Sequence, residues 1–136
     1  THIFDDSIQL GWVTAYSPEH KLLLGYIFKT TEYPWLNLWH WKKDGAPHAH
    51  GLEFGTTGLG KPYPELLSAC ADFYGRKSYI ILPAKGTLNK SYLMFVLPIS
   101  GAYEGTEHIN YDGKNITIKP SKSEQVIELN APFGQW

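Results

Sequence analysis

The chain has 136 residues, of which 43% are hydrophobic and 15% aromatic, and its formal net charge is −1. That length suffices for one domain with a hydrophobic core and is too short for two. A nearly neutral chain without a basic stripe offers no electrostatic footprint for nucleic acid. The longest apolar run, Tyr92 to Ile99, is far below the ~20 residues that a membrane-spanning helix needs. We therefore expect neither a nucleic-acid nor a membrane partner.

Cysteine usage and the first residues bear on the compartment. Cys70 is the only cysteine, so the chain can form neither an intrachain disulfide nor a thiolate metal cluster. The first ten residues, THIFDDSIQL, contain neither the basic nor the apolar region of a signal peptide. These two features slightly favour the cytoplasm. The chain also lacks an initiator Met, as expected for a processed product or a fragment.

Alternating segments separated by turns recur about every ten residues in the first half, a pattern typical of all-β proteins. Four strands are predicted there: Ile8 to Tyr16, Lys21 to Lys29, Tyr33 to Lys42 and His48 to Phe54. The segment from Lys43 to Pro47, Lys-Asp-Gly-Ala-Pro, is a strong turn signal between the last two.

The second half begins with the one predicted helix, Pro64 to Phe73, which has proline at its start. Five further strands are predicted: Lys77 to Ala84, Leu88 to Ile99, Glu107 to Tyr111, Asn115 to Lys119 and Gln125 to Asn130. Asp112-Gly113 is a hairpin signal within the C-terminal module. The expected fold is a single antiparallel β-sandwich domain over residues 1–136 with one short helix, and residues 101–136 supply its C-terminal hairpin strands.

An aromatic stripe lies in the strand predicted from Tyr33 to Lys42. Alternation places Trp35, Asn37, Trp39 and Trp41 on one face. The opposite face carries Leu36, Leu38 and His40. Such a stripe is either a packed core or a platform on which flat rings bind a sugar. In the second case Trp35, Asn37 and Trp39 are the expected ligand contacts.

Glu53 is the candidate catalytic residue. It lies in an apolar, glycine-rich strand, where desolvation can raise a carboxylate pKa and suit it to act as a general base. The other interpretation is a solvent-facing strand glutamate. Strand parity puts Glu53 with Gly51 on one face, and His50 with Leu52 on the other.

His48 and His50 form a His-x-His pair that a strand could present to one metal ion, with His40 or His108 as a third ligand. The metal motif of cupins also starts with His-x-His. Its glycine and glutamate, however, stand at other spacings than Gly45 and Glu53 do here. Two surface histidines after a turn are the commoner explanation, so we expect no metal and no other cofactor.

Residues 1–100, including GWVTAYSPEHKLLLGYIFKTTEYPWLNLWHW and HGLEFGTTGLGKPYPELL, resemble the C-terminal half of the galactose mutarotase-like (aldose 1-epimerase-like) β-sandwich proteins. Two motifs carry the resemblance. Pro34 to Trp39 matches a Pro-aromatic-Leu-x-Leu-Trp strand, and Leu52 to Thr56 matches an apolar-Glu-x-x-Thr strand. Ile81 to Gly86, before Ser91-Tyr92, is similar to the closing element of the family.

The resemblance implies part of an antiparallel supersandwich that binds a hexose-like sugar. Family enzymes use the glutamate at the Glu53 position as base on the anomeric hydroxyl, while a histidine donates to the ring oxygen. That histidine and a substrate-binding arginine belong to the N-terminal half of the family. His50 stands where relatives carry arginine before Gly-Leu-Glu, so it is an expected substrate contact.

Four functions follow, of which sugar binding without full catalytic machinery ranks first. The others are an active aldose 1-epimerase or sugar isomerase using Glu53, a cupin-like metal site at His48 and His50, and an accessory domain without a site. Half a sandwich would leave a broad apolar face uncovered, and such faces mark interfaces. We therefore expect a homo-oligomer, or pairing with the missing N-terminal half.

Overall fold

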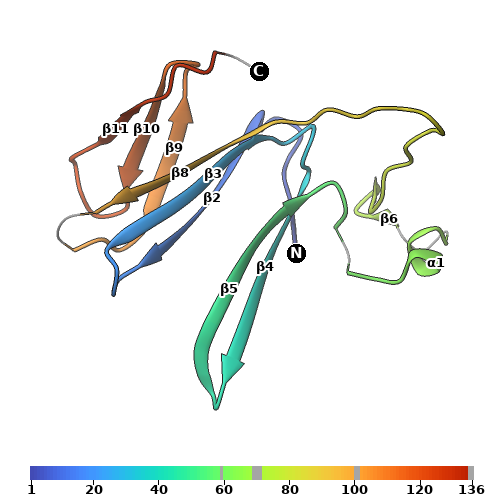
Figure 1. The fold of residues 1–136 in the computed structure, drawn as a ribbon, viewed down its shortest axis with the longest axis horizontal. Coiled ribbons are helices and arrows are strands. Elements are labelled where there is room, and N and C mark those ends of the chain that lie inside the picture. Colours follow the sequence, from blue (N-terminus) through green and yellow to red (C-terminus); the bar gives the residue numbers. More distant parts are fainter. Residues whose placement is uncertain (59, 69–71, 100–101, 135–136) are drawn as a thin grey trace. The chain divides into compact units, whose positions relative to one another are not determined.

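The computed structural model describes residues 1–58, 60–68, 72–99 and 102–134. Antiparallel strands dominate this part of the chain and one short helix accompanies them (Figure 1). The expected all-β character is therefore confirmed. No helix within the described ranges is both long and apolar enough to cross a membrane.

The chain divides into two compact units. Unit 1 comprises Thr1–Gly11 and Ile27–Tyr92, and unit 2 comprises Trp12–Tyr26 and Leu93–Trp136. The boundaries between the units interrupt the strands Leu10–Ser17 and Leu22–Lys29, and a third boundary follows the first residue of the strand Tyr92–Pro98. The single-domain organisation expected from length stays a prediction.

Unit 1 is built around a three-stranded antiparallel sheet in the order β1-β4-β5. Its elements are β1 (His2–Ile3), β4 (Trp35–Lys43), β5 (Ala46–Gly55), α1 (Tyr63–Leu66), β6 (Asp72–Phe73) and β7 (Arg76–Lys77). β1 pairs with β4 at His2↔Leu36 and Ile3↔Trp35. From Asn37 to the turn, the described part of this sheet is therefore a two-stranded hairpin (Figure 1).

The β4–β5 hairpin follows from its turn and its alternation. Asp44 (φ 51°) and Gly45 (φ 82°) are both left-handed, the geometry of the two-residue turn that Asp-Gly favours. One face carries the pairs Trp35↔Gly55, Asn37↔Glu53 and Trp39↔Gly51. The other carries Leu36↔Phe54, Leu38↔Leu52 and His40↔His50. This register confirms the predicted parity from Trp35 to Trp41 and from His50 to Phe54.

Aromatic packing holds unit 1 together. Trp35 is fully buried, and its ring lies against Gly58, where a Cβ would come within 1.9 Å of the indole Cε3. Phe28 stacks on Phe54 with ring centroids 4.4 Å apart. Three further rings complete this cluster by edge contacts: Phe4, Tyr33 and Tyr92.

Hydrogen bonds of two charged side chains hold the segment before β4 in place. Glu32 accepts a hydrogen bond from the Ser91 backbone N–H at 3.1 Å. Its backbone carbonyl accepts one from the Lys90 ammonium, which lies 5.3 Å from the centre of the Tyr33 ring. Desolvation raises the pKa of Tyr33, and the Glu32 charge adds to the effect. These contacts tie the segment before β8 to the segment before β4.

Two predicted elements of unit 1 are wrong in extent. The helix ends at Leu66, and Phe73 lies in β6 instead; Cys70 falls outside the described residues. A tight turn at Tyr74 (φ 50°) and Gly75 (φ 74°) follows β6 and leads into β7. The strand predicted from Lys77 to Ala84 is reduced to the end of β7, because Pro83 cannot donate to a ladder and accepts a turn bond from Gly86 N–H.

Unit 2 contains most of a three-stranded sheet with the order β2-β3-β8 and all of a second sheet with the order β11-β10-β9. The strands are β2 (Leu10–Ser17), β3 (Leu22–Lys29), β8 (Tyr92–Pro98), β9 (Thr106–Tyr111), β10 (Asn115–Pro120) and β11 (Ile127–Asn130). In the first sheet the Phe95 ring lies over Gly25, where a Cβ would come within 2.1 Å of Cζ. All three predicted C-terminal strands are present.

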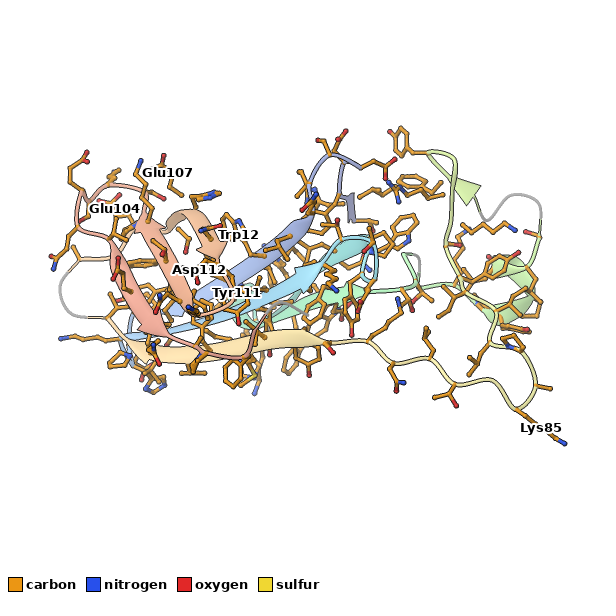
Figure 2. The ribbon with its side chains drawn as sticks, turned by 90° about the horizontal axis from the view of Figure 1, so that it is seen from above. Trp12, Lys85, Glu104, Glu107, Tyr111 and Asp112 are labelled. Carbon is orange, nitrogen blue, oxygen red and sulfur yellow. The ribbon has the colours of Figure 1, made fainter. Side chains whose placement is uncertain are left out.

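The β9–β10 turn is held by a side chain. Asp112 Oδ1 accepts hydrogen bonds from the backbone N–H groups of Asn115 (2.7 Å) and Lys114 (2.8 Å). These two bonds, the Asn115 bond first, lower the pKa of Asp112. Tyr111 lies next to Asp112, and both are labelled in Figure 2. The Tyr111 hydroxyl donates hydrogen bonds to the Ala131 and Gly134 carbonyls, which anchors the chain after β11.

Candidate functional site

The first candidate site is one face of the β4–β5 hairpin, which we call the tryptophan face. Its members share parity through the cross-strand register. They are Trp35, Asn37, Trp39, Trp41, Gly51 and Glu53. The indoles differ sharply in accessibility, since Trp35 is 0% exposed whereas Trp39 is 49% and Trp41 is 45% exposed.

Trp35 belongs to the core and not to a ligand platform. Its ring packs 6.0 Å from that of Phe73 and is covered by Gly58. The expectation that Trp35 contacts a sugar is therefore wrong for this structure. Strand parity correctly placed Trp35 with Trp39, but burial was decided by Gly58 and Phe73, which come from distant parts of the chain.

Glu53 and Asn37 face each other across the hairpin. The Glu53 side chain is exposed and its Oε1 lies over Gly51, where a Cβ would be 3.4 Å from Oε1 and 3.4 Å from the Cβ of Trp39. Asn37 Oδ1 is buried and finds no hydrogen-bond partner among the described residues. The Glu53 carboxylate and the Cβ of Trp39 therefore lie beside Gly51, and Asn37 is the cross-strand partner of Glu53.

Strand parity correctly placed His40 and His50, but His48 departs from it, and the expected role of His50 as a substrate contact beside Glu53 is wrong. His50 stacks on His40, with ring centroids 4.4 Å apart and planes at 19°, on the face opposite Glu53. The register shifts at Trp41/Lys42 and leaves His48 unpaired, and its ring packs edge-on against Trp41 at 4.3 Å. His50 therefore cannot join Glu53 in one site on this hairpin.

The same arrangement argues against the alternative of a metal pair at His48 and His50. His48 and His50 have different ring neighbours because the bulge turns His48 toward Trp41. Within the described ranges, no group of three or more His, Cys, Asp or Glu side chains could hold a metal ion. A cupin-like site at His48 and His50 finds no support in this geometry.

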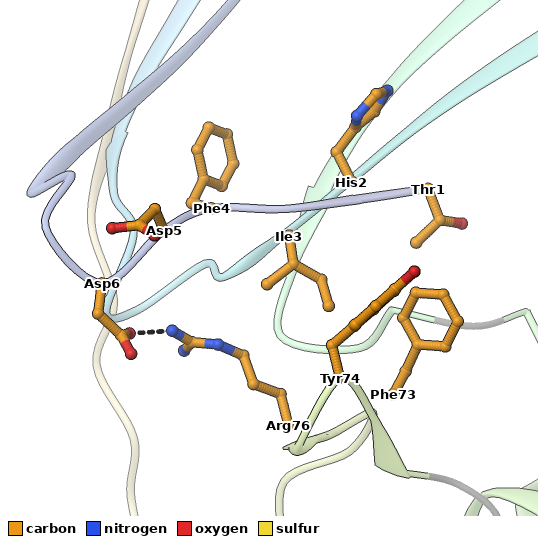
Figure 3. Close-up of a pocket in the computed structure, with 9 residues that line it drawn as sticks. All are labelled: Thr1, His2, Ile3, Phe4, Asp5, Asp6, Phe73, Tyr74 and Arg76. Carbon is orange, nitrogen blue, oxygen red and sulfur yellow. Dashed lines mark hydrogen bonds and ion pairs between the residues drawn. The ribbon is translucent and has the colours of Figure 1, made fainter.

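A second candidate site is a pocket of about 450 Å³ (Figure 3). Its lining residues come from the N-terminal segment and the β6–β7 hairpin: Thr1, His2, Ile3, Phe4, Asp5, Asp6, Phe73, Tyr74 and Arg76. Arg76 forms an ion pair with Asp6, and Tyr74 presents its ring from a left-handed backbone (φ 50°) while remaining 86% exposed. Hydrogen bonds from Ser7 to the carboxylate lower the pKa of Asp5.

The sequence prediction missed this pocket. A bulky residue in a left-handed turn is strained, and such strain marks functional positions often enough to be informative. The usable signal was Tyr74-Gly75, where a hairpin turn carries tyrosine in place of asparagine or aspartate. The two parts of the chain that line this pocket are separated by the long segment between β1 and β6, so no local sequence pattern predicts that they meet.

No family model, no curated protein and no solved structure matches the chain. The resemblance to the galactose mutarotase-like proteins therefore stays a prediction, and the case for a function rests on the geometry of the tryptophan face.

Proposed function

We propose that the tryptophan face of the β4–β5 hairpin binds a hexose-like sugar. One observation carries the proposal: Asn37 and Glu53 pair across the strands beside the half-exposed ring of Trp39. Flat aromatic rings pack against apolar C–H surfaces, and carboxylate and amide oxygens accept hydrogen bonds from hydroxyl groups. A pyranose presents both kinds of surface.

Accessibility separates this proposal from the core interpretation. Trp39 and Trp41 each leave nearly half of their surface in contact with solvent, which a core residue does not do. The buried Oδ1 of Asn37 lacks a partner among the described residues, and an unmade hydrogen bond of this kind is costly. Rotation of the Asn37 side chain would bring that oxygen to the surface, where a sugar hydroxyl would donate a hydrogen bond to it.

Catalysis is the second candidate because Glu53 is free to act as a base. Its carboxylate makes no hydrogen bond or ion pair to the residues that the structure describes. An epimerase also needs an acid within reach of the same ring. His50 lies on the opposite face, and His48 is five positions along β5, about 16 Å at ~3.3 Å per residue. Binding without catalysis therefore ranks first.

The finer fold and the assembly remain proposals. We propose a sandwich of the mutarotase-like type and a self-associating chain. Met94 (58% exposed) and Val96 (54% exposed) support association, because they form an apolar face on the edge strand β8. Pairing with another polypeptide that completes the sandwich, and an accessory role in a larger glycan-processing protein, are alternatives of the same kind.

Replacing either exposed indole should weaken sugar binding. We expect Trp39→Ala and Trp41→Ala each to raise Kd about tenfold, because each removes a stacking ring worth roughly 1–1.5 kcal/mol. Titration calorimetry or ligand-observed NMR with a panel of methyl hexosides measures this. Tyr63→Ala is the matched control, since Tyr63 is a 70% exposed aromatic residue on α1. An equal loss in the Tyr63 variant, or no sugar bound by the unmodified protein, contradicts the proposal.

Glu53→Gln separates binding from catalysis. We expect this variant to bind the sugar about tenfold more weakly, since a charged acceptor contributes roughly 1.5–3 kcal/mol to a hydrogen bond. Polarimetry of freshly dissolved α-glucose or α-galactose should show the buffer rate of mutarotation with both proteins. Acceleration by the unmodified protein that Glu53→Gln abolishes would instead establish the epimerase alternative.

A further inference from the structure

We infer that His40 and His50 form a two-histidine site for a divalent transition-metal ion on the face of the β4–β5 hairpin opposite the tryptophan face. The two residues are directly paired across the strands. Their rings lie 4.4 Å apart and nearly parallel, and both side chains are exposed. Neutral imidazole is a preferred ligand of zinc, copper and nickel ions.

The spacing suits coordination of one ion by both rings. Metal–nitrogen bonds of about 2.0–2.1 Å place two nitrogens on one ion roughly 2.9 Å apart when cis and 4.2 Å apart when trans. The two ring centres lie 4.4 Å apart, close to the roughly 4.5 Å expected for two imidazoles bound cis to one ion, because each ring centre lies about 1.1 Å beyond its nitrogen. In the stacked arrangement the nitrogen lone pairs run side by side, so coordination needs rotation about the Cβ–Cγ bonds, a torsion with a broad energy minimum. The exposure of both rings leaves room for it.

The ligand set decides which ion binds. Among the described residues no third His, Cys, Asp or Glu joins the pair, so water completes the coordination sphere. A site with two imidazoles and open positions follows the general affinity order of divalent metals, in which copper binds most tightly. The chemical class of ligand is therefore a borderline, exchangeable divalent cation, with Cu²⁺ as the strongest member.

The position of the pair gives the ion a structural consequence. From Asn37 to the turn the sheet has two strands in the described part of the chain, and such hairpins are only marginally stable alone. An ion held by one residue from each strand joins β4 to β5 near the end that carries Trp39 and Trp41. Metal binding should therefore stiffen the tryptophan face without contacting it.

Cu²⁺ titration of protein without an affinity tag tests the inference. We expect one ion to bind with an electron paramagnetic resonance signal that shows coupling to two imidazole nitrogens. His40→Gln and His50→Gln should each weaken Cu²⁺ binding about tenfold or more, because each removes one of the two imidazole ligands. His48→Gln is the matched control, since His48 lies on the same hairpin but packs on Trp41. His2→Gln is a second control, in which Cu²⁺ binding should be unchanged.

Two results would overturn the inference. One is equal weakening by His48→Gln and His50→Gln, and the other is unchanged binding in the double variant His40→Gln/His50→Gln. Circular dichroism shows whether each variant folds. If a variant does not fold, a measurement on the unmodified protein still tests the inference. Cu²⁺ should broaden the NMR signals of the His40 and His50 rings before those of the other four histidines.

Discussion

Gly58→Ala should destabilise unit 1 by about 3 kcal/mol, the upper end of the usual cost of overpacking a core. A Cβ at this position would lie 1.9 Å from Cε3 and 2.0 Å from Cδ2 of Trp35. The indole is fully buried, so it cannot move aside into solvent. Urea unfolding followed by tryptophan fluorescence measures the loss.

Gly60→Ala provides the control for Gly58→Ala. Nothing lies within 4 Å of a Cβ built at Gly60, so this change should leave the midpoint of unfolding nearly unaltered. Neither glycine has a left-handed backbone, which removes backbone strain as an explanation. Equal effects of the two substitutions would show that Trp35 does not pack on Gly58.

Gly25→Ala should cost unit 2 a similar amount, about 3 kcal/mol, because a Cβ there would meet the Phe95 ring at 2.1 to 2.6 Å. Phe95 is itself buried. Shortening the ring should relieve the collision, so the double variant Gly25→Ala/Phe95→Leu should be more stable than the sum of the two single losses implies. Such non-additivity is expected only for residues in contact.

Chemical denaturation of the four proteins in this cycle gives the coupling free energy. A coupling near zero would mean that Phe95 does not cover Gly25. The Gly58 and Gly25 variants together also report on cooperativity, because each perturbs one unit. A single transition in both variants would show that the units unfold together.

The geometry of the β4–β5 hairpin could be predicted from the sequence because its determinants are local. Asp44-Gly45 favours a two-residue turn, and that turn together with strict alternation sets which residues face each other. The cross-strand meeting of Asn37 and Glu53 follows directly. Burial along the same face does not, because Trp35 is covered by Gly58 and Phe73 and Trp39 is not.

The histidines show where periodicity fails. Strand alternation with a period of two predicts that His48 and His50 share a face. A β-bulge instead turns His48 toward Trp41, and His50 stacks on His40. The position of a bulge depends on the partner strand, and nothing in the segment His48-Ala49-His50 specifies it. The pocket beside Tyr74 is equally hidden, because its walls come from segments far apart in the chain.

The division of the chain has a consequence for synthesis on the ribosome. Strand β8 is a neighbour of β3 in their sheet, so this sheet cannot be completed until Pro98 has been made, and its closure must span everything from β4 to β7. Pairing over such a separation is slow because loop closure precedes any gain from contacts. The β4–β5 hairpin needs only its own turn and forms in microseconds. The segment proposed to bind sugar is thus among the first parts of the chain able to take shape as it emerges.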